Sequence, residues 1–336
     1  MVLAHPSRAN QEPDPTMPLR TISLVTDDRT PLSAYLTRQW PGTWPRGDSI
    51  VGNSIFIPPI GGQHRGDWLV CPSSPPPERI STDIPRERRI LFVVEPPEFW
   101  QPPVELLDSF GYVVSPYPLP QFQGVQIPSV TTGLLWWYGI DLDGHRPTGN
   151  FMTLDAIRRE PWPEKTRLMS VITSAKAFLP GHRKRLAFVQ QLKEAFGDAL
   201  DLYGAGINPI ADKREALAPY LYHVAIENAV HPHFWTEKLA DPMLGRCVTF
   251  YHGAPSAAAS FPEGVVVPID IDRPQAAIDT IVAKLRGPLP DRPVIEAARN
   301  RLIDFYNFPS FCDHLIDAIE AQENEQPARY ASAAHA

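Results

Sequence analysis

The sequence predicts an α/β protein with two doubly wound domains, each built around a parallel sheet. Short apolar runs bounded by proline, glycine, serine or aspartate recur along the chain, and uninterrupted runs of this kind are typical of strands buried on both faces. In the second half these runs alternate with segments of helical periodicity, as in parallel α/β folds. The length of 336 residues fits two domains of ordinary size.

Proline organises the first half of the chain. The sequence has 39 prolines, roughly twice the usual share, and most of them cluster before residue 130. Proline interrupts helices and central strands, so short strands between irregular loops are expected. These strands are Ile22–Val25, Ile55–Ile57, Trp68–Cys71, Ile90–Val94 and Tyr112–Ser115. The segment Val130–Ile140 fits a helix or a strand, and its periodicity does not decide between them.

The second half shows a clearer alternation. Strands are expected at Leu168–Thr173, Leu200–Gly204, Tyr222–Asn228, Val248–Gly253 and Val265–Asp270. Helices are expected from Pro180 onward, where Leu186, Val189, Leu192 and Phe196 recur at helical spacing, and at Thr236–Leu244, Pro274–Leu285, Pro293–Tyr306 and Phe308–Ala321. With the joint placed at residue 160, the expected parts are a disordered tail at 1–17, domains at 18–160 and 161–322, and a flexible tail at 323–336.

Composition excludes several classes of protein. The formal charge is -7, from 31 basic and 38 acidic side chains, which argues against a nucleic-acid-binding protein. No apolar run reaches the roughly 18 residues of a membrane helix, and the first residues do not resemble a secretory signal. The three cysteines are far apart, which excludes a disulfide scaffold and suits the cytoplasm.

Three loops that follow expected strands carry candidate chemistry, because ligands of such folds bind outside the carboxyl ends of the strands. The first holds Glu95, which follows the run ILFVV between prolines. A partly desolvated and rigidly held carboxylate suits a general base. The alternative is an ordinary exposed loop acid, and Glu98 is a nearby competitor.

The second loop opens the helix at GHRKRL, with His182, Arg183, Lys184 and Arg185 in or near its first turn. Cations are unfavourable at a helix start by roughly 0.3–1 kcal/mol each. The inverted charge is accounted for if an anion such as a phosphate binds there. A solvated basic turn explains the residues equally well.

The third segment spans residues 220–256. Its strand delivers Glu227 and Asn228, and after a short loop Thr236, Glu237 and Lys238 open a helix. An acid and a lysine at this point can bind the ribose and the phosphates of a nucleoside diphosphate. Further on, Gly253 offers bare backbone for close approach to a ligand. An ordinary strand–loop–helix unit remains the alternative.

This third segment resembles the signature of the family 10 glycosyltransferases, the α-1,3-fucosyltransferases of bacterial type. The family pattern reads F-E-N, five residues, Y-V-T-E-K and then a G-x-P-S turn. The chain has I-E-N at 226–228, five residues, F-W-T-E-K at 234–238 and G-A-P-S at 253–256. Upstream, Thr173–Ser174 and the helix R-L-A-F-V-Q-Q-L from Arg185 follow the family's order.

The resemblance implies the GT-B architecture, in which two Rossmann-like domains face a cleft, with the nucleotide sugar bound by the C-terminal domain. It implies inverting transfer of fucose from GDP-fucose to a hydroxyl of an acceptor glycan, with no cofactor and no essential metal. Glu95 would be the general base, and Arg185 and Lys238 would neutralise the diphosphate. Asn228 and Glu237 would hold the nucleotide and the sugar.

Two departures concern the donor-binding segment. Phe234 replaces the family's tyrosine, so a hydroxyl contact near the phosphates is lost, and Trp235 replaces a small β-branched residue. With Gly253, Phe234 completes the expected donor-binding set. Another nucleotide sugar, or a non-catalytic relative that binds a sugar nucleotide or polysaccharide, therefore stays open as an alternative.

Weaker patterns receive ordinary structural interpretations. The D-x-D pairs at 141–143 and 270–272, and the H-x-H at 231–233, supply too few ligands to predict a metal site. The G-x-G at 204–206 lacks a third glycine and predicts a turn. Trp136 and Trp137 are assigned to the core in preference to sugar stacking.

The sequence thus favours a metal-independent cytoplasmic glycosyltransferase with a nucleotide-sugar donor. Its acceptor would be an oligosaccharide, a lipopolysaccharide or another glycan, and nucleic acid is not expected as a partner. Peripheral contact with the inner membrane is left open.

Overall fold

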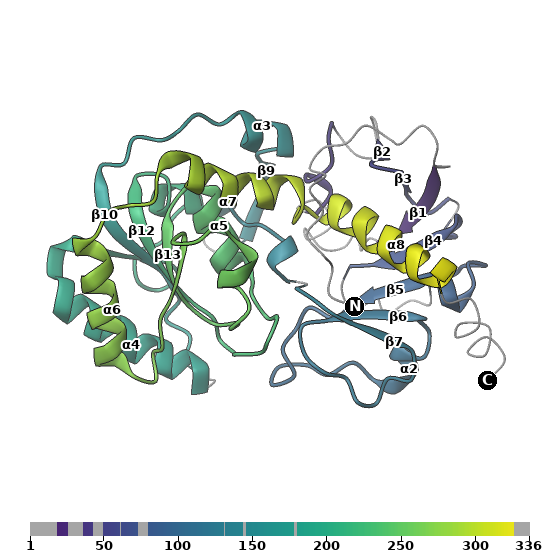
Figure 1. Ribbon diagram of the computed structural model, residues 1–336, viewed down its shortest axis with the longest axis horizontal. Coiled ribbons are helices and arrows are strands. Elements are labelled where there is room, and N and C mark those ends of the chain that lie inside the picture. The colour runs from purple at the N-terminus through teal and green to yellow at the C-terminus, as the bar shows by residue number, and fades with distance from the viewer. Residues whose placement is uncertain are drawn as a thin grey trace. The chain divides into compact units, whose positions relative to one another are not determined.

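The computed structural model describes residues 19–25, 36–42, 50–60, 62–72, 80–130, 132–143, 146–177 and 180–325. The chain divides into two compact units (Figure 1). The first unit is Met1–Thr131 with Asp304–Ala336, and the second is Thr132–Ile303. The tail expected at 1–17 lies outside the described residues. Within the described ranges, no helix is long and apolar enough to cross a membrane.

The described part of the first unit contains a sheet in the order β2-β3-β1-β4-β5-β6-β7. Only the two-residue β2 runs antiparallel to its neighbour in this sheet. The strands are β1 (Arg20–Leu24), β2 (Ile50–Val51), β3 (Ser54–Ile57), β4 (Trp68–Cys71), β5 (Arg89–Phe92), β6 (Tyr112–Ser115) and β7 (Val125–Pro128). The five strands expected here are confirmed to within a few residues.

Both faces of this sheet are covered, as the continuous apolar strands require. Successive side chains of β5 point to opposite faces. Phe92 packs against Phe308 of the last helix, α8 (Phe308–Glu325), with ring centroids 5.2 Å apart. Leu91 joins a separate buried cluster with Leu107 of the short helix α2 (Val104–Leu107). A 3-10 helix, η1 (Arg86–Arg88), precedes β5. In the described residues between β1 and β7, proline-rich connections account for the small helical content.

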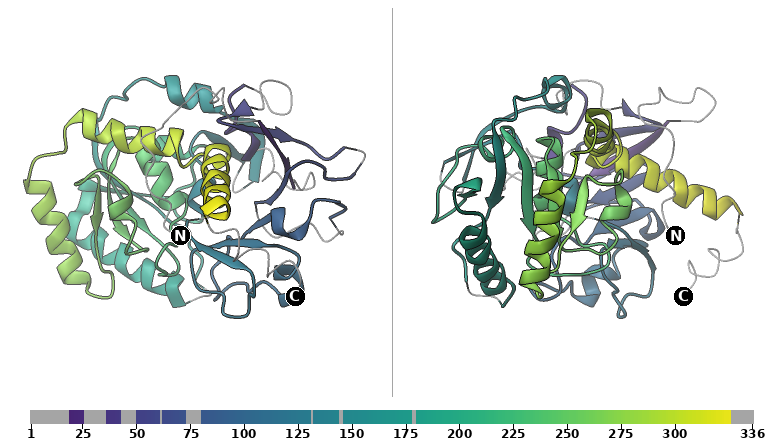
Figure 2. Two further views of the ribbon diagram at one scale, coloured as in Figure 1. Left: turned by 45° about the vertical axis from the view of Figure 1, so that its right-hand side comes forward. Right: turned by 60° about the vertical axis from the view of Figure 1, so that its left-hand side comes forward.

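Helix α8, yellow in Figures 1 and 2, belongs to the first unit although it ends the described chain. Arg20 of β1 binds its carboxylates, at 2.7 Å to Asp313 and 2.6 Å to Asp317. The division of the chain therefore differs from the expected one: the second unit begins at residue 132 instead of 161, and α8 returns to the first. Residues 323–325, expected in a flexible tail, are helical, and residues 326–336 lie outside the described ranges.

The second unit contains a fully parallel sheet in the order β11-β10-β12-β13-β14. The strands are β10 (Arg167–Ile172), β11 (Leu200–Tyr203), β12 (Tyr220–Ile226), β13 (Val248–His252) and β14 (Val266–Pro268). All five were expected. From β10 the chain moves to β11 on one side and then returns to β12 on the other, so the topological switch point lies between β10 and β12.

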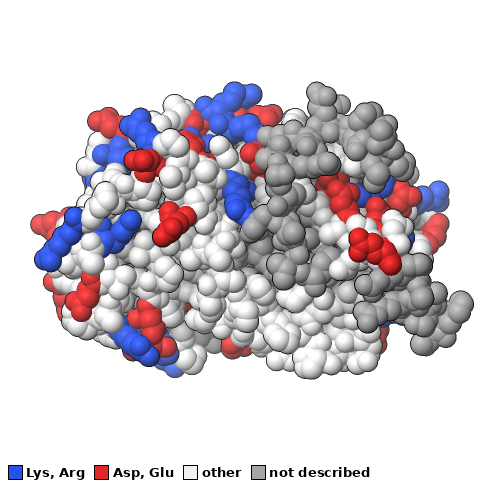
Figure 3. Space-filling view, viewed as in Figure 1, with Lys and Arg blue, Asp and Glu red and all other residues white. Residues whose placement is uncertain are grey.

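Helices cover both faces of this second sheet. The described helices of the second unit are α3 (Leu154–Arg159), α4 (Pro180–Phe196), α5 (Glu237–Leu244), α6 (Pro274–Arg286) and α7 (Arg292–Asp304). Because right-handed crossovers leave β10 and β12 in opposite directions, α4 and α5 lie on opposite faces. Helix α6 packs beside α4, and α5 packs over β12 and β13 (Figure 1). On the face seen in Figure 3, basic and acidic side chains of this unit are interspersed.

The remaining elements are short. Four 3-10 turns are η2 (Thr132–Leu134), η3 (Gly197–Ala199), η4 (Lys213–Ala216) and η5 (Ala258–Ser260), and β8 (Ile140–Asp143) pairs with β9 (Arg146–Phe151) as a hairpin. The ambiguous segment 130–140 is neither a long helix nor a strand, since η2 and irregular chain occupy it. The predicted α/β class is confirmed: both units contain largely parallel sheets with helices.

Candidate functional site

Several of the predicted residues converge at the switch point of the second sheet. Strand β10 leads into Ser174, and β12 leads into Glu227 and Asn228, so all three follow adjacent strands. Helices α4 and α5 begin beside the same strand ends. We call the residues Ser174, Arg185, Asn228, Glu237 and Lys238 the switch-point site.

Arg185 is the basic residue of the first turns of α4 that reaches this site. Its side chain is buried and donates to Oδ1 of Asn228 and, at 3.4 Å, to Oγ of Ser174. Among the residues that the structure describes, its buried Nε atom has no hydrogen-bond partner. Burial lowers the pKa of Arg185 and outweighs the attraction of Glu227 and Glu237. A desolvated guanidinium held in this way is suited to bind an anion at the helix start.

The other three residues of this basic turn take ordinary positions. Lys184 is exposed and pairs with Asp272 at 2.6 Å, and Arg183 donates to the carbonyl of Ala177 at 3.1 Å. His182 is buried, and burial lowers its pKa. The prediction of an anion site therefore rests on Arg185 alone among the four.

Glu227 is a buried carboxylate that fixes the loop between β12 and α5. Its Oε1 accepts from the backbone N of Thr236 at 2.8 Å, and both of its oxygens accept from Oγ1 of Thr236. Thr236 also caps α5 by accepting from Lys238 N. Burial raises the pKa of Glu227 against the attraction of Lys238, whose Nζ lies 3.7 Å away. The sequence pattern contains Glu227 but predicts no role for it.

Glu237 and Lys238 open α5 as a partly exposed ion pair. Nζ of Lys238 lies 3.1 Å from Oε1 of Glu237. Although burial alone would raise it, the pKa of Glu237 falls to about 2 because Lys238 and Lys213 attract the carboxylate. Burial opposes the charge of Lys238, but Glu237 and Glu227 raise its pKa above the ordinary value. Both side chains are therefore ionised at neutral pH.

Lys213 and Asp241 support this pair and were missed by the sequence analysis. Lys213, from η4, lies 2.6 Å from the buried Asp241 of α5 and 4.0 Å from Glu237. Asp241 also accepts from the backbone N atoms of Trp137 and Tyr138. Lys213 lies in a short turn and Asp241 lies inside a helix, and no sequence pattern predicts that the two form an ion pair.

The segment between Asn228 and Thr236 contributes packing. Phe234 is buried, with its ring edge-to-face to His231 at 6.2 Å. Trp235 is fully buried against Phe261 at 5.7 Å, and a side-chain carbon at Gly133 would lie 2.1 Å from its ring. The large residue at position 235 thus fills the core of the second unit.

The turn at 253–256 contacts the same loop. Oγ of Ser256 donates to the carbonyl of Pro232. A side-chain carbon at Gly253 would lie 2.2 Å from the hydroxyl of Tyr251 and 2.6 Å from Glu227. Packing inside the protein therefore accounts for the glycine at this position, and its backbone remains available to line a neighbouring cavity.

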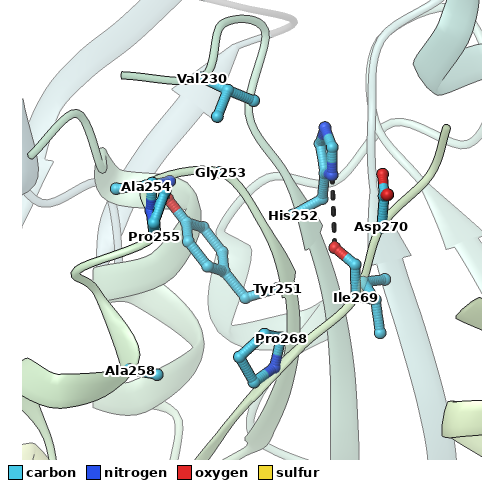
Figure 4. Close-up of a pocket in the computed structure, with 10 residues that line it drawn as sticks. All are labelled: Val230, Tyr251, His252, Gly253, Ala254, Pro255, Ala258, Pro268, Ile269 and Asp270. Carbon is cyan, nitrogen blue, oxygen red and sulfur yellow. Dashed lines mark hydrogen bonds between the residues drawn. The ribbon is translucent and has the colours of Figure 1, made fainter. Parts of the chain in front are cut away.

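That cavity has a volume of about 210 Å³ and opens beyond the ends of β13 and β14 (Figure 4). Its walls are largely apolar, with Val230, Tyr251 and Pro255 among them, and Val230 is 50% exposed. Two polar side chains, His252 and Asp270, line it as well. Nδ1 of His252 lies 3.3 Å from the carbonyl oxygen of Ile269 (Figure 4).

Glu95 belongs to the first unit, so the structure does not group it with the residues of the second. It lies partly buried in the loop after β5, and its backbone carbonyl accepts from the hydroxyl of Tyr117 at 2.8 Å. Burial, with the charges of Glu98 and Glu95, raises the pKa of Tyr117 to about 12.

The weaker patterns behave as structural features. Gly204 and Gly206 have φ angles of 117° and 76°, and a side-chain carbon at Gly204 would lie 1.9 Å from the carbonyl of Thr173. Trp136 is buried, as predicted, whereas Trp137 is only partly buried. In the described ranges, no three histidine, cysteine, aspartate or glutamate side chains group as a metal site would require.

No protein-family model matches the sequence. Among solved structures, the chain is similar to an α1,3-fucosyltransferase crystallised with GDP, at 15% identity and a TM-score of 0.47, over 89% of this chain and 92% of that one. It is similar to an α1,3-fucosyltransferase with GDP-fucose at 15% identity and a TM-score of 0.45, over 90% and 92%. It is also similar to the GtfA/B complex, at 12% identity and a TM-score of 0.37, over 70% of this chain and 53% of that one. At these values the function has to be inferred from the residues of this chain.

Proposed function

We propose that the protein is an inverting glycosyltransferase that moves fucose from GDP-fucose to a hydroxyl of an acceptor glycan. The observation that carries the proposal is the convergence of Arg185 and Lys238, from two helix starts, on the switch point of one parallel sheet. Their motif context resembles that of the family 10 glycosyltransferases. The solved structures named above are in keeping with it.

The two cations suit a diphosphate leaving group. When the bond between the sugar and the diphosphate breaks, negative charge develops on the phosphate oxygen that leaves. Preorganised cations in a desolvated site stabilise that charge better than water does. Arg185 supplies a planar guanidinium, and Lys238 supplies an ammonium at the start of α5. On this view no metal ion is needed at the diphosphate.

Glu237 suits the hydroxyl groups of the donor. Its low pKa, about 2, keeps it a hydrogen-bond acceptor at any physiological pH. Lys213 and Lys238 hold the carboxylate from two sides, which fixes its position before the ligand binds. Asn228, whose amide oxygen accepts from Arg185, presents its remaining amide hydrogens to the donor.

The cavity at His252 and Asp270 suits a nucleobase. Its volume of about 210 Å³ admits a flat ring between apolar walls. A carboxylate accepts hydrogen bonds but donates none. Guanine presents two adjacent donors, N1–H and the 2-amino group, whereas uracil presents one. Asp270 therefore favours GDP over UDP.

Glu95 completes the proposal as the general base. It would take the proton of the acceptor hydroxyl as the oxygen attacks the anomeric carbon from the face opposite the diphosphate, which inverts that carbon. A partly buried carboxylate in a loop held by prolines and by Tyr117 suits this role. A cytoplasmic setting is part of the proposal, since all three cysteines are buried free thiols.

Thermal stabilisation of the purified protein by nucleotides tests the donor site. A ligand that binds the folded state raises its melting temperature. We expect a shift with GDP and GDP-fucose, a smaller one with UDP, and no effect of EDTA. Lys238→Ala should abolish the shift, whereas Lys184→Ala should retain it, because Lys184 is an exposed cation that pairs with Asp272. If UDP alone raised the melting temperature, the donor would be a UDP sugar and not GDP-fucose. If no nucleotide raised it, the proposal would be contradicted.

Glu95→Gln separates an enzyme from a sugar-nucleotide-binding relative. If the protein is an enzyme, this variant should still bind GDP. It should transfer no fucose to the acceptors of a glycan panel that the unmodified protein uses. If the unmodified protein binds GDP-fucose yet never releases GDP with any acceptor, the second candidate, a non-catalytic binding protein, is favoured.

A further inference from the structure

We propose that the second unit carries a separate binding site for a small organic anion with an apolar body, such as an aryl phosphate or carboxylate. The site is formed by Trp162, Lys165, Leu221, Leu289 and Arg292. It does not depend on the function proposed above, because it shares no residue with the switch-point site.

The site is a cavity of about 420 Å³ at the opposite edge of the second sheet. Lys165 comes two residues before β10, Leu221 is the second residue of β12, and Arg246 comes two residues before β13. The switch-point residues follow the ends of these parallel strands or lie beside them, whereas this cavity lies at their beginnings. Its volume falls within the usual range of small-molecule pockets, roughly 300–1,000 Å³.

Apolar side chains form much of the wall. Leu221, Leu289, Pro290 and Ile295 line the cavity with Trp162. Leu289 is 37% exposed and counts among the large hydrophobic residues that face solvent. A ligand with an apolar body would remove this surface from water, at about 25 cal/mol per Å².

The charge at the cavity is cationic and incompletely paired. Of its described lining residues, Lys165, Arg246 and Arg292 are basic and Glu164 is acidic. Nζ of Lys165 donates to the carbonyl oxygens of Gly245 at 2.7 Å and Leu217 at 3.5 Å. Within the described ranges, neither Lys165 nor Arg292 has a carboxylate within ion-pair distance. Burial lowers the pKa of Lys165 against the attraction of Glu160, so an anion that pairs with the half-buried ammonium would stabilise its charged form.

Arg246 gives the cavity a preformed wall. It has a φ of 59°, an unusual angle for a residue other than glycine. Its side chain is held at 2.6 Å by Glu296 and at 2.8 Å by the carbonyl of Glu160. The guanidinium groups of Arg246 and Arg292 lie 5.6 and 4.9 Å from the ring centroid of Trp162. These contacts fix the Trp162 ring before a ligand arrives, which lowers the entropy cost of binding.

Phenyl phosphate is the probe that tests the site, with phenol and inorganic phosphate as its two halves. Binding to the full chain is measured by calorimetry, and by the indole N–H resonance of Trp162, assigned through Trp162→Phe. We expect phenyl phosphate to bind at least tenfold more tightly than either half and to shift that resonance. Arg292→Gln, a change at an exposed side chain, should weaken binding about tenfold, and Lys165→Met more.

Lys238→Ala and saturating GDP serve as controls for the switch-point site, and neither should change phenyl phosphate binding. The proposal is overturned if phenyl phosphate does not bind, or if GDP displaces it. Equal binding by Arg292→Gln would overturn it as well, even where Lys165→Met fails to fold. Stabilisation by GDP and its loss in Lys238→Ala test the proposed function, whereas binding of phenyl phosphate in the presence of GDP tests this inference, so the two fail separately.

Discussion

Gly181 lies so close to Asn228 that a side-chain carbon at residue 181 would stand 2.2 Å from the backbone carbonyl oxygen of Asn228. The first turn of α4 therefore approaches the end of β12 at a distance that only glycine permits. This approach also brings Arg185, one turn further along α4, to the amide oxygen of Asn228. The close packing of Gly181 against Asn228 therefore helps to place the guanidinium of Arg185 beside the same residue.

Gly181→Ala should disturb this approach. Overpacking against backbone forces α4 to shift and typically costs about 1–3 kcal/mol. We expect a lower free energy of unfolding in urea and at least tenfold weaker GDP binding, because Arg185 moves with the helix.

Gly287→Ala is the matched control for this change. The atoms nearest to its added carbon would lie 3.6 and 3.8 Å away, which is ordinary contact. Both its stability and its GDP binding should stay within error of the unmodified protein. If Gly181→Ala behaves like Gly287→Ala, the close approach is unimportant.

Thr236→Val tests the contact between Glu227 and the start of α5. The change removes a hydroxyl that donates to the buried carboxylate and caps the helix. A lost cap and an under-satisfied buried carboxylate together cost about 2–3 kcal/mol. Thr236→Ser keeps the hydroxyl and should lose less than about 1 kcal/mol. Urea unfolding of the two variants decides the point, and a loss in Thr236→Val no larger than that in Thr236→Ser would contradict the role of the hydroxyl.

The fold was largely predictable from the sequence because the strands of the second unit are continuous apolar runs with helices between them. Segment 130–140 was not, because Trp136 and Tyr138 are buried without regular periodicity. The grouping of α8 with the first unit was not predictable either, for a related reason. The ion pairs that hold α8 to β1 join residues about 290 positions apart, as Arg20 and Asp313 show.

The candidate site was predictable where its residues are close in the sequence. Asn228, Glu237 and Lys238 could be placed together because a strand, a loop and a helix start carry them. Lys213 could not, since its link to Asp241 forms only when η4 packs beside α5. Gly253 was identified for its bare backbone, but its packing against Tyr251 and Glu227 emerges only in three dimensions.

The stability contributed by Glu237 should depend on pH. Its folded pKa, about 2, is depressed from the ordinary value of 4.5, so its contribution is present above about pH 4.5 and is lost as pH falls toward 2. After allowance for partial exposure, the contribution is roughly 2 kcal/mol. Glu237→Gln should therefore be destabilising at pH 7 and nearly neutral at pH 2.5, as measured by urea unfolding. The exposed Glu194→Gln should show little effect at either pH, and a pH-independent loss in Glu237→Gln would contradict the expectation.

Arg20→Met should loosen α8 from the first unit. Arg20 is 7% exposed and binds Ser54, Asp313, Asp317 and Glu320. Removal of one partner of a buried ion pair typically costs about 3–5 kcal/mol, because the other charge stays buried. Hydrogen exchange should rise in β1 and α8 more than in the second unit, whereas the exposed Arg65→Met should leave it unchanged.

The uncompensated carboxylate of Asp313 gives this prediction a second readout. Burial already raises the pKa of Asp313 above its ordinary value, against the attraction of Arg20. Without Arg20 the folded pKa rises further, so the folded state binds a proton more readily than the unfolded state and the variant gains stability as pH falls. The deficit of Arg20→Met should thus be smaller at pH 5 than at pH 8. Addition of Asp313→Asn should recover part of the loss at pH 8, since an amide buries at lower cost than an unpaired charge. A deficit independent of pH would instead assign the role of Arg20 to packing by its aliphatic stem.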